Sequence, residues 1–409
     1  MTTEIKGTTV AVIGLGYIGL PTAACLADNG YRVFGVDIDK NVVDTVRLGS
    51  SHIIEPGLDE SLKRGIAKGN LTVSLTISIC DIYIICVPTP LKREKNRAIA
   101  DLRFLKQAFD AICPLLKKGD TVILESTSPV GTTEQMFELL KTRGAPVEQI
   151  SLGYCPERVL PGNTMVELVR NSRIIGGVDS KSSRAIADFY KTFVTGAVIE
   201  TDAATAELSK LVENSYRDVN IAFANEIQKL AFAYNVDAWK LMEVVNQHPR
   251  VDMLKPGIGV GGHCIAVDPW FLIADDHCET KLMRVARELN DCQPEWVVKR
   301  VSSMVSSFCE ANGRTPWVAC LGLTYKADID DLRDSPAVKI VQLLINQGLH
   351  VKCVEPNLAE HHSFDLVSLE EAIVKSDLML VLVNHKQFKG LKARLASASS
   401  PLVVDFCGY

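Results

Sequence analysis

A long helical pattern constrains the fold of this chain more than any other feature. No glycine or proline occurs between Asp202 and Val236. Apolar residues recur there at three-, four- and seven-residue spacings: Leu208, Val212, Val219, Phe223, Ile227 and Leu230. The pattern predicts one helix of about 34 residues, roughly 50 Å long at a rise of about 1.5 Å per residue. Because such a helix is longer than those of ordinary globular domains, it indicates a spine between domains or a subunit interface.

Short apolar strands alternate with helical stretches on both sides of this helix. Strands are expected over 8–13, 32–36, 81–87, 121–125, 150–154 and 173–175. The C-terminal strands WVACLGLTY, HVKCVEP and DLMLVLVNH follow the order of the N-terminal VAVIGLGY, VFGVDID and DIYIICVPTP, a weak similarity between two halves. The polar segment 179–183 is either an exposed helix start or a boundary. This alternation predicts βαβ units with mostly parallel sheets.

We therefore predict an α/β protein with two doubly wound, Rossmann-like domains joined by a helical segment that contains the long central helix. The expected boundaries are 1–200, 201–311 and 312–409. The length of 409 residues is enough for two or three domains, each with its own core.

Composition excludes several functional classes. The 44 basic and 49 acidic residues form no block of like charge, which argues against a dedicated nucleic-acid or membrane-surface binder. The 12 cysteines are dispersed and form no C-x-x-C pair, so we expect reduced, mostly buried thiols and a cytoplasmic protein. The start MTTEIKGTTVAVIG does not resemble a signal peptide, and no apolar run is long enough for a transmembrane helix.

The turn Gly14-Leu15-Gly16-Tyr17-Ile18-Gly19 closes the first strand and opens a helix. Its glycines permit a tight turn, close approach of a pyrophosphate to the backbone, and close packing of helix on strand. Asp37 ends the second strand, where a carboxylate would bind an adenosine ribose and repel a 2′-phosphate. The combination favours NAD over NADP. The alternative is a tight turn in an ordinary βα unit.

A second constellation is GVGGHCIAVDP, residues 259–269, within a loop rich in glycine and proline. Cys264 lies there between His263 and Asp268. A polar loop is a poor place for a core residue, and loops on a rigid scaffold often carry catalytic groups. Cys264 is therefore a candidate nucleophile, with a small buried hydrophobe as the alternative, the interpretation we give to the other cysteines. His263 is more often structural in such a place.

Polar groups also follow two predicted strands. The hydroxyls of Ser126-Thr127-Ser128 could hold a water or cap the next helix, and Glu157 in Cys155-Pro156-Glu157-Arg158 is a candidate general base. Both segments lie where doubly wound folds bind ligands. On the long helix, Lys210 and Asn214 share one face at positions i and i+4, either as functional groups or as a solvated flank.

In the C-terminal half, Lys326 and Arg333 lie just beyond the first strand. They could meet phosphate, or they could belong to a solvated loop and pair with acidic neighbours: Asp330, Asp331 and Asp334. Ser335-Pro336 predicts an N-cap followed by an N1 proline. No spacing of His, Cys, Asp or Glu resembles a structural zinc site, so we expect no metal.

Together these segments resemble one family. The motifs occur in the order GLGYIGLP with Asp37, VPTP, ESTSPVGTT, YCPERVLPG, ELSKLVENSYRDVNIAFANE, HPRV, GVGGHCIAVDPWF and LGLTYKADIDDLRDSPA. The set resembles the UDP-sugar 6-dehydrogenases of the UDP-glucose/UDP-mannuronate dehydrogenase superfamily. HCIAVDPWF and CPERVLPG are most similar to the bacterial UDP-N-acetyl-D-mannosamine branch. The UDP-glucose branch has a small or aromatic residue in place of His263, a Pro-Lys pair in place of Ala266-Val267, and a later arginine motif that is missing before the final VVDFCGY.

The resemblance implies an NAD-dependent, four-electron oxidation of a sugar C6 alcohol to a carboxylate, using two NAD and one water. Cys264 would capture the aldehyde as a thiohemiacetal that becomes a thioester. The implied substrate is UDP-N-acetyl-D-mannosamine, and the product would enter a surface polysaccharide. The first domain would bind NAD and the last the UDP moiety, with the site in the cleft between them, and at least a homodimer is expected through the long helix.

The resemblance also implies individual site residues. The catalytic residues would be Cys264, Lys210, Asn214, Asp268, Thr127 and Glu157. Of these, Lys210 and Asn214 would stabilise an oxyanion, whereas the last three would position or deprotonate water. The cofactor residues would be Gly14, Gly16, Tyr17, Ile18, Gly19, Asp37, Pro88, Thr89, Thr127 and Arg333. The substrate residues would be Glu157, Arg158, Lys210, Asn214, Arg250, Gly261, His263 and Lys326, with Arg250 supplied by a neighbouring subunit in some members.

The sequence alone leaves other functions open. The substrate could instead be UDP-N-acetylglucosamine or UDP-glucose. The chain could be a single-hydride dehydrogenase of the 3-hydroxyacid type, which also combines a Rossmann domain with a long helix. It could also be a non-catalytic regulator that binds NAD or a UDP-sugar. The number of NADH formed per sugar separates these classes: two, one or none.

Overall fold

The computed structural model describes residues 7–94, 97–274, 279–358, 363–391, 395 and 401–408. The chain divides into two compact units, 1–213 and 214–409. The division falls inside α8 (Ala203–Ala233), the predicted long helix. The three-part division at residues 200 and 311 stays a prediction.

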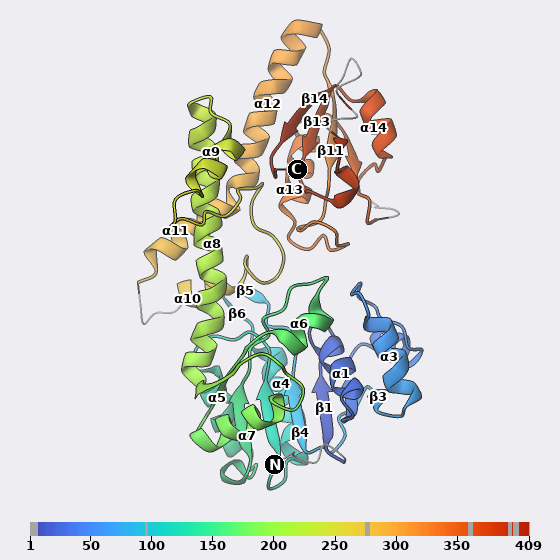
Figure 1. The fold of residues 1–409 in the computed structure, drawn as a ribbon, viewed down its shortest axis with the longest axis vertical. Coiled ribbons are helices and arrows are strands. Elements are labelled where there is room, and N and C mark those ends of the chain that lie inside the picture. The colour runs from blue at the N-terminus through green and yellow to red at the C-terminus, as the bar shows by residue number, and fades with distance from the viewer. Residues whose placement is uncertain are drawn as a thin grey trace. The chain divides into compact units, whose positions relative to one another are not determined.

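The N-terminal unit is built on one sheet (Figure 1). Its described strands lie in the order β10-β9-β8-β7-β4-β1-β2-β3. The strands are β1 Thr9–Ile13, β2 Arg32–Val36, β3 Leu71–Ser74, β4 Ile82–Ile85, β7 Thr121–Leu124, β8 Ser151–Tyr154, β9 Arg173–Gly177 and β10 Val198–Asp202. Neighbours pair in parallel except β8 and β9, which are antiparallel, so the mostly parallel sheet is confirmed. A separate antiparallel hairpin, β5 Leu91–Glu94 with β6 Arg97–Ala100, was not predicted.

Helices cover both faces of this sheet. They are α1 Gly19–Asp28, α2 Lys40–Arg47, α3 Leu58–Ala67, α4 Arg103–Ile112, α5 Thr132–Thr142, α6 Thr164–Arg170 and α7 Ser180–Tyr190, with 3₁₀ turns at Cys113–Leu115 and Val147–Gln149. Along β1, Val10 and Val12 enter one buried cluster, whereas Ala11 and Ile13 enter another. Successive side chains of a strand point to opposite faces, so two cores on one strand show a doubly wound unit.

The C-terminal unit contains a smaller parallel sheet in the order β12-β11-β13-β14. Its described strands are β11 Trp317–Leu321, β12 His350–Val354, β13 Leu378–Val381 and β14 Leu402–Asp405. Its described helices beyond α8 are α9 Ala238–Val245, α10 Asp268–Ile273, α11 Lys281–Asp291, α12 Gln293–Asn312, α13 Pro336–Asn346 and α14 Leu369–Lys375, with a 3₁₀ turn at Lys386–Phe388. The Ser335 side chain accepts hydrogen bonds from the amides of Ala337 and Val338, which confirms the predicted N-cap of α13.

The two sheets repeat one local geometry. Gly14 donates its amide to the carbonyl of Val36, and Gly322 donates its amide to that of Val354, both at 2.8 Å. Both glycines have a φ of 90°, a conformation that residues with a side chain rarely adopt. The similarity that the sequence indicated between the two halves is therefore present in their first βα turns.

Helix α8 is 31 residues long, about 46 Å at 1.5 Å per residue. The predicted helix is confirmed, although it ends before Val236. Asn235 adopts a φ of 54°, and the amide of Val236 bonds the carbonyl of Ala231 at 2.8 Å. A left-handed residue with this backward hydrogen bond terminates a helix, and asparagine is one of the few residues that tolerate it. The other open segment, 179–183, proves to be a helix start, because Asp179 caps α7.

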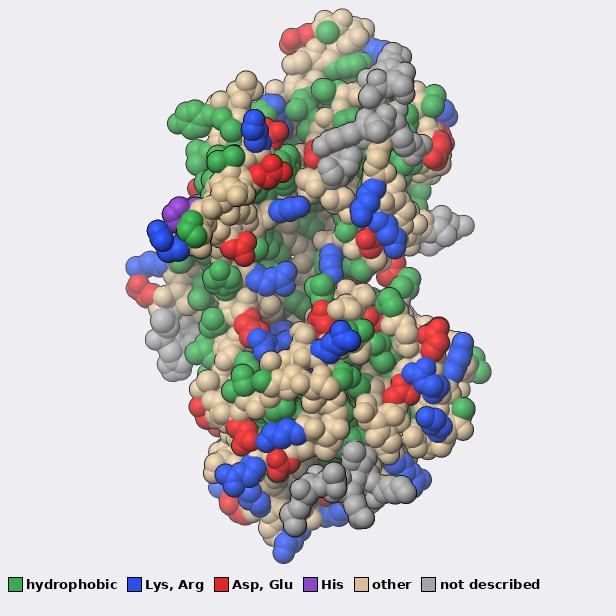
Figure 2. All heavy atoms as spheres, in the orientation of Figure 1, with side chains coloured by type: hydrophobic (Ala, Val, Ile, Leu, Met, Phe, Trp, Pro, Cys, Tyr) green, Lys and Arg blue, Asp and Glu red, His purple; other side chains and the backbone are tan. Residues whose placement is uncertain are grey.

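Basic and acidic side chains are interspersed over the face of the molecule drawn in Figure 2. This agrees with the absence of like-charge blocks in the sequence. Within the described ranges, no helix combines the length and the apolar character that crossing a bilayer requires.

Candidate active site

The glycine turn after β1 has three glycines in three different environments. A Cβ on Gly14 would lie 2.7 Å from the carbonyl oxygen of Cys86, and one on Gly19 would lie 1.8 Å from that of Gly14. A Cβ on Gly16 would instead meet no described atom within 4 Å. Gly14 and Gly19 therefore allow close packing of strand and helix, whereas Gly16 leaves open space beside the backbone, as a pyrophosphate requires.

The remaining residues of this turn lead into helix α1. Ile18 is the N-cap of α1 and provides no side-chain cap, and Tyr17 packs against the core below. Asp37, at the end of β2, accepts the amide of Leu15 at 2.8 Å on Oδ2 and that of Asp39 at 2.9 Å on Oδ1. The carboxylate is thereby fixed beside the turn, at the place expected for binding a ribose.

The loops after β4 and β7 are joined at the same edge of the sheet. Thr89 donates its hydroxyl to the carbonyl of Thr127 at 2.7 Å, and Ser126 donates to the carbonyl of Val87 at 2.7 Å. Pro88, which precedes Thr89 in the loop after β4, is exposed. Carboxyl ends of adjacent parallel strands form the ligand edge of a doubly wound sheet, so Pro88, Thr89 and Thr127 lie on the edge that also carries Gly14 and Asp37.

Glu157 and Lys210 form a buried ion pair within the N-terminal unit. Lys210 Nζ lies 3.0 Å from Glu157 Oε1 and 2.8 Å from its carbonyl oxygen, and the two side chains are 6% and 10% exposed. The other oxygen, Oε2, accepts the amide of Val159 at 2.9 Å. This burial rules out a solvated flank at Lys210. A buried pair of this kind holds a charged amine in one orientation, as an oxyanion-stabilising group needs.

Arg158 turns to a different partner. Its guanidinium pairs with Glu213 at 2.6 Å, and Nη1 donates to the carbonyl of Ser172 at 3.2 Å. A predicted substrate residue thus has its charge already compensated within its own unit, so we expect it to orient the segment after β8 more than to bind an anion directly.

Cys264 lies exposed in the loop between α9 and α10, which rules out the buried-hydrophobe alternative for this residue. Its carbonyl accepts the amides of Val267 at 3.0 Å and Asp268 at 2.8 Å, a turn that leads into α10. The other cysteines are buried or half-buried as predicted, except for exposed Cys292, and Cys278 lies outside the described residues.

Asn214 connects helix α8 to the start of α10. Its Nδ2 donates to Asp268 Oδ2 at 2.5 Å, and both side chains are buried. The solvated-flank alternative is therefore wrong for Asn214 as well. Asp268 lies four residues after Cys264. The buried contact therefore places a candidate base, Asp268, and a polar donor, Asn214, beside the turn that carries the thiol.

The predicted residues of the C-terminal half gather around the same loop. A Cβ on Gly261 would lie 2.5 Å from the carbonyl oxygen of Asp334, and the His263 ring lies edge-on to Tyr325 with centroids 6.4 Å apart. The guanidinium of Arg333 contacts His263 Nε2 at 3.3 Å and forms an ion pair with the Asp331 carboxylate at 2.7 Å. The acidic pairing considered for Arg333 is thus present, together with a contact to the cysteine loop.

Lys326 and Arg250 are the remaining predicted substrate residues. Lys326 is half-buried, and its carbonyl accepts the hydroxyl of Thr324 at 2.7 Å. Arg250 is exposed in the loop after α9, with its amide 3.3 Å from His248 Nδ1. The roles of both remain predictions.

Comparison with known proteins decides the family. The chain matches the UDP-glucose/GDP-mannose dehydrogenase family over the NAD-binding domain at 8–194, the central domain at 204–292 and the UDP-binding domain at 319–409. The chain belongs to this family. The resemblance found in the sequence is confirmed, and so are dehydrogenase chemistry and NAD as the cofactor.

Relatives agree with this assignment. An NDP-N-acetyl-D-galactosaminuronic acid dehydrogenase of Ralstonia nicotianae is 46% identical, covering 95% of this chain and 93% of its own. A UDP-N-acetyl-D-mannosamine dehydrogenase of Escherichia coli is 44% identical, covering 93% and 94%. The solved UDP-N-acetyl-mannosamine dehydrogenase of Staphylococcus aureus superposes with a TM-score of 0.87 at 40% identity, covering 98% and 94%.

The glycine turn of this family member fits a dinucleotide. The open space at Gly16, the fixed carboxylate of Asp37 and the positive end of α1 are the three features that an adenosine diphosphate requires. Among the described residues, no group of three or more His, Cys, Asp or Glu side chains could hold a metal ion.

Sequence reasoning missed Glu207, which is fully buried on α8. Its carboxylate accepts the amides of Gly131 at 2.6 Å and Thr133 at 2.8 Å, and the Thr133 hydroxyl at 2.6 Å. It therefore caps α5 from another helix, and the capping role considered for the hydroxyls of 126–128 is wrong. Burial raises the pKa of Glu207 to about 7 despite these hydrogen bonds. The signal available in the sequence was an acidic residue on the inner side of an amphipathic helix.

A buried pair at the carboxyl edge of the C-terminal sheet was also missed. His385 Nε2 lies 3.1 Å from Glu355 Oε2, and His385 Nδ1 accepts the amide of Asp328 at 2.9 Å. The Glu355 oxygen also accepts the amide of Leu323 at 2.7 Å. The pair holds the turn that carries Lys326, so it supports a predicted substrate residue.

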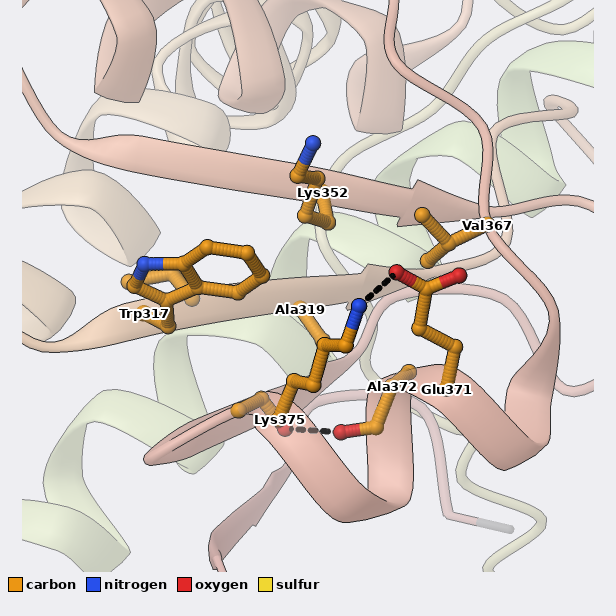
Figure 3. Close-up of a pocket in the computed structure, with 9 residues that line it drawn as sticks. Trp317, Ala319, Lys352, Val367, Glu371, Ala372 and Lys375 are labelled. Atoms are coloured by element: carbon orange, nitrogen blue, oxygen red, sulfur yellow. Dashed lines mark hydrogen bonds and ion pairs between the residues drawn. The ribbon is translucent and has the colours of Figure 1, made fainter.

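The small pocket in Figure 3 belongs to the opposite edge. Trp317, Lys352 and Glu371 line it between β11, β12 and α14, and Lys375 pairs with Glu371 at 2.8 Å across its wall. Trp317 is the first residue of β11, so the pocket lies near the amino ends of the strands, away from the ligand edge of this sheet.

Proposed function

We propose that this chain oxidises C6 of UDP-N-acetyl-D-mannosamine to the carboxylate with NAD, yielding UDP-N-acetyl-D-mannosaminuronate. The observation that carries the proposal is the exposed Cys264 thiol in a turn fixed by the buried Asn214–Asp268 contact. The sugar is supported by 44% identity over nearly the whole chain to the Escherichia coli enzyme of that name. We also propose that the boundaries at residues 200 and 311 separate NAD-binding, central and UDP-binding parts.

In the proposed mechanism the second oxidation proceeds through a covalent intermediate. Oxidation of the alcohol to the carboxylate removes four electrons as two hydrides, takes up one water and releases three protons; two NAD molecules would supply the hydride acceptors within one catalytic cycle. The Cys264 thiol adds to the aldehyde carbon, forming a C–S bond. Loss of the second hydride turns this thiohemiacetal into a thioester. Water then breaks the C–S bond and returns the thiol.

The buried polar groups are assigned to the charges of these steps. Lys210 and Asn214 stabilise the oxyanion that forms when the thiol or water adds to C6. Thr127, Glu157 and Asp268 position or deprotonate water, and the contacts of Glu157 with Lys210 and of Asp268 with Asn214 keep both carboxylates oriented. Arg250, Gly261, His263 and Lys326 are assigned to the UDP-sugar and Arg333 to the cofactor.

A second substrate has a specific observation in its favour. The Ralstonia nicotianae relative is 46% identical and is named for N-acetyl-D-galactosaminuronic acid, which makes UDP-N-acetylgalactosamine the second candidate. The test is kcat/KM for UDP-N-acetylmannosamine, UDP-N-acetylgalactosamine, UDP-N-acetylglucosamine and UDP-glucose, with NADH counted per sugar. We expect two NADH and the highest value for the first. A preference for another sugar overturns the substrate, one NADH indicates simple alcohol oxidation, and none indicates a binding protein.

We also infer that two copies pair through α8. Val212, Tyr216, Phe223 and Leu230 are 44%, 65%, 54% and 50% exposed at spacings of four and seven residues along this helix. A row of large apolar side chains at this spacing is suited to packing against a second helix. Sedimentation should give a dimer that Tyr216→Glu with Phe223→Glu dissociates. Val374→Glu, at an 82% exposed apolar residue on α14, is the control.

A further inference from the structure

Four buried polar side chains in the C-terminal unit form a continuous chain of hydrogen bonds behind the cysteine loop. Asp218, Asn225, Arg287 and Asn290 are each at most 1% exposed. Asn225 Nδ2 donates to Asn290 Oδ1 at 2.9 Å, Asn290 Nδ2 donates to Asp218 Oδ1 at 2.8 Å, and Arg287 Nη1 donates to the same Asp218 oxygen. The chain links α8 to α11 through polar groups where apolar packing would be the simpler solution.

Both ends of this network terminate on the backbone of the cysteine loop. Asn225 Oδ1 accepts the amide of Gly257 at 2.8 Å, and Arg287 Nη1 donates to the carbonyl of Ile265 at 3.3 Å. Gln293 Nε2 adds a hydrogen bond to the carbonyl of Gly257 at 3.0 Å. The loop is therefore held seven residues before Cys264 and one residue after it.

The segment between these two anchors has little rigidity of its own. It contains glycines at 257, 259, 261 and 262, and the structure assigns no helix or strand between α9 and α10. Glycine loses more backbone entropy on ordering than any other residue, so such a loop depends on external contacts to hold one conformation. Of the two anchors at Gly257 and Ile265, Arg287 supplies the one nearer to Cys264 in the sequence, and burial beside Asp218 fixes the guanidinium.

The charge state of Asp218 suits this role. Burial raises the pKa of its carboxyl to about 6, while Arg287 and Asn290 oppose that rise. Asp218 is therefore ionised at neutral pH and pairs with the guanidinium. A hydrogen bond that involves a charged group is stronger than one between neutral groups.

We propose that Arg287 and Asp218 are positioning residues that hold the Cys264 thiol where it captures the aldehyde from the first oxidation. The inference rests on the proposed thioester chemistry. It predicts a specific defect when the anchor is weakened: the first oxidation proceeds, but part of the aldehyde escapes before the C–S bond forms.

Arg287→Lys tests this directly, because lysine keeps a positive charge beside Asp218, but its shorter side chain does not place a nitrogen where Nη1 contacts both Asp218 and Ile265. With the UDP-sugar, NAD and a carbonyl-trapping hydrazide, we expect fewer than two NADH per sugar and a trapped aldehyde. In the protein without substrate or NAD, hydrogen–deuterium exchange of the loop amides should accelerate by about tenfold or more, as loss of a charged hydrogen bond implies. Asp218→Asn, which keeps the volume, should show a smaller effect in the same direction.

Arg284→Lys is the matched control. Arg284 lies on the same helix and donates to the carbonyl of Ile273 at 3.2 Å, nine residues after Cys264. The Arg284→Lys variant should form two NADH per sugar and release no aldehyde to the hydrazide. Its loop amides should exchange at the same rate as those of the unmodified protein.

The outcomes separate the two proposals. Lower activity that still yields two NADH and no aldehyde in Arg287→Lys would assign a purely structural role and overturn the positioning proposal. If the unmodified protein itself yields one NADH, or Cys264→Ser still forms the acid, the thioester chemistry fails instead.

Discussion

Glu355 takes the same place in the C-terminal sheet that Asp37 takes in the N-terminal one. Asp37 accepts the amide of Leu15 at 2.8 Å, and Glu355 accepts that of Leu323 at 2.7 Å, in each case the residue after the first glycine of the turn. The difference is His385, which bonds the Glu355 carboxylate and is fully buried. We propose that the carboxylate of Asp37 also binds a ribose, whereas that of Glu355 is committed to holding its own loop.

Asp37 should set the choice between NAD and NADP. Replacing it by serine removes the negative charge that would repel a 2′-phosphate, so the kcat/KM ratio of NADP to NAD should rise by roughly tenfold or more. Steady-state kinetics with both cofactors measure this. Asp39→Ser, two residues further along and at the cap of α2, is the control, because serine also caps helices. An unchanged ratio in Asp37→Ser would remove Asp37 from cofactor selection.

Cys264→Ser should lower kcat for acid formation by at least about a thousandfold, because the hydroxyl is a much weaker nucleophile than a thiolate. NAD binding, measured by calorimetry, should stay nearly unchanged, since the glycine turn belongs to the other unit. Cys292→Ser alters another exposed thiol and should retain full activity. Normal turnover by Cys264→Ser would refute the thioester route.

Substitutions at Lys210 and Glu157 should change the unfolding free energy and the activity in different ways. Lys210→Met leaves the Glu157 carboxylate buried without its partner, which should cost about 3 kcal/mol of unfolding free energy. Adding Glu157→Gln removes the second charge and should restore much of that loss. Activity should stay low in both variants, because the ammonium that stabilises the oxyanion is gone. Recovery of kcat in the double variant would argue against a catalytic role for Lys210.

Glu207 should make stability depend on pH. Its pKa rises from 4.5 to about 7 in the folded protein, so the folded state binds this proton more tightly than the unfolded state. Its contribution to stability is greatest below pH 4.5 and falls as the pH rises to about 7. The difference in unfolding free energy between the unmodified protein and Glu207→Gln should therefore decrease over that interval in urea titrations. Glu138→Gln, an exposed acid on α5, is the control, and a constant difference for Glu207→Gln would contradict the assignment.

Local patterns predicted much of the fold. Apolar periodicity identified α8, the glycine motif identified the first βα turn, and Ser335-Pro336 identified the start of α13. These features arise from interactions between residues close in sequence. The hairpin of β5 and β6 was not predicted, because its short strands, LKRE and RAIA, contain only one β-branched residue, Ile99.

In the candidate site, too, features that depend on local sequence were predicted, whereas contacts between distant segments were not. Cys264, Lys210, Asn214 and Asp268 were predicted as site residues from residue type, spacing and the resemblance to the family. Their hydrogen-bond partners could not be identified in this way. Glu207 is 74 residues from Thr133, and Asp218 is 69 residues from Arg287.

The sequence by itself determined the chemical groups, the α/β class and the long helix, because periodicity and motif spacing act over a few residues. Only the tertiary structure decided which polar groups are buried, which carboxylate is paired with which cation, and how the loop of Cys264 is held. Desolvation and hydrogen bonding depend on atoms brought together from distant segments, and these interactions determine how each group is oriented and charged.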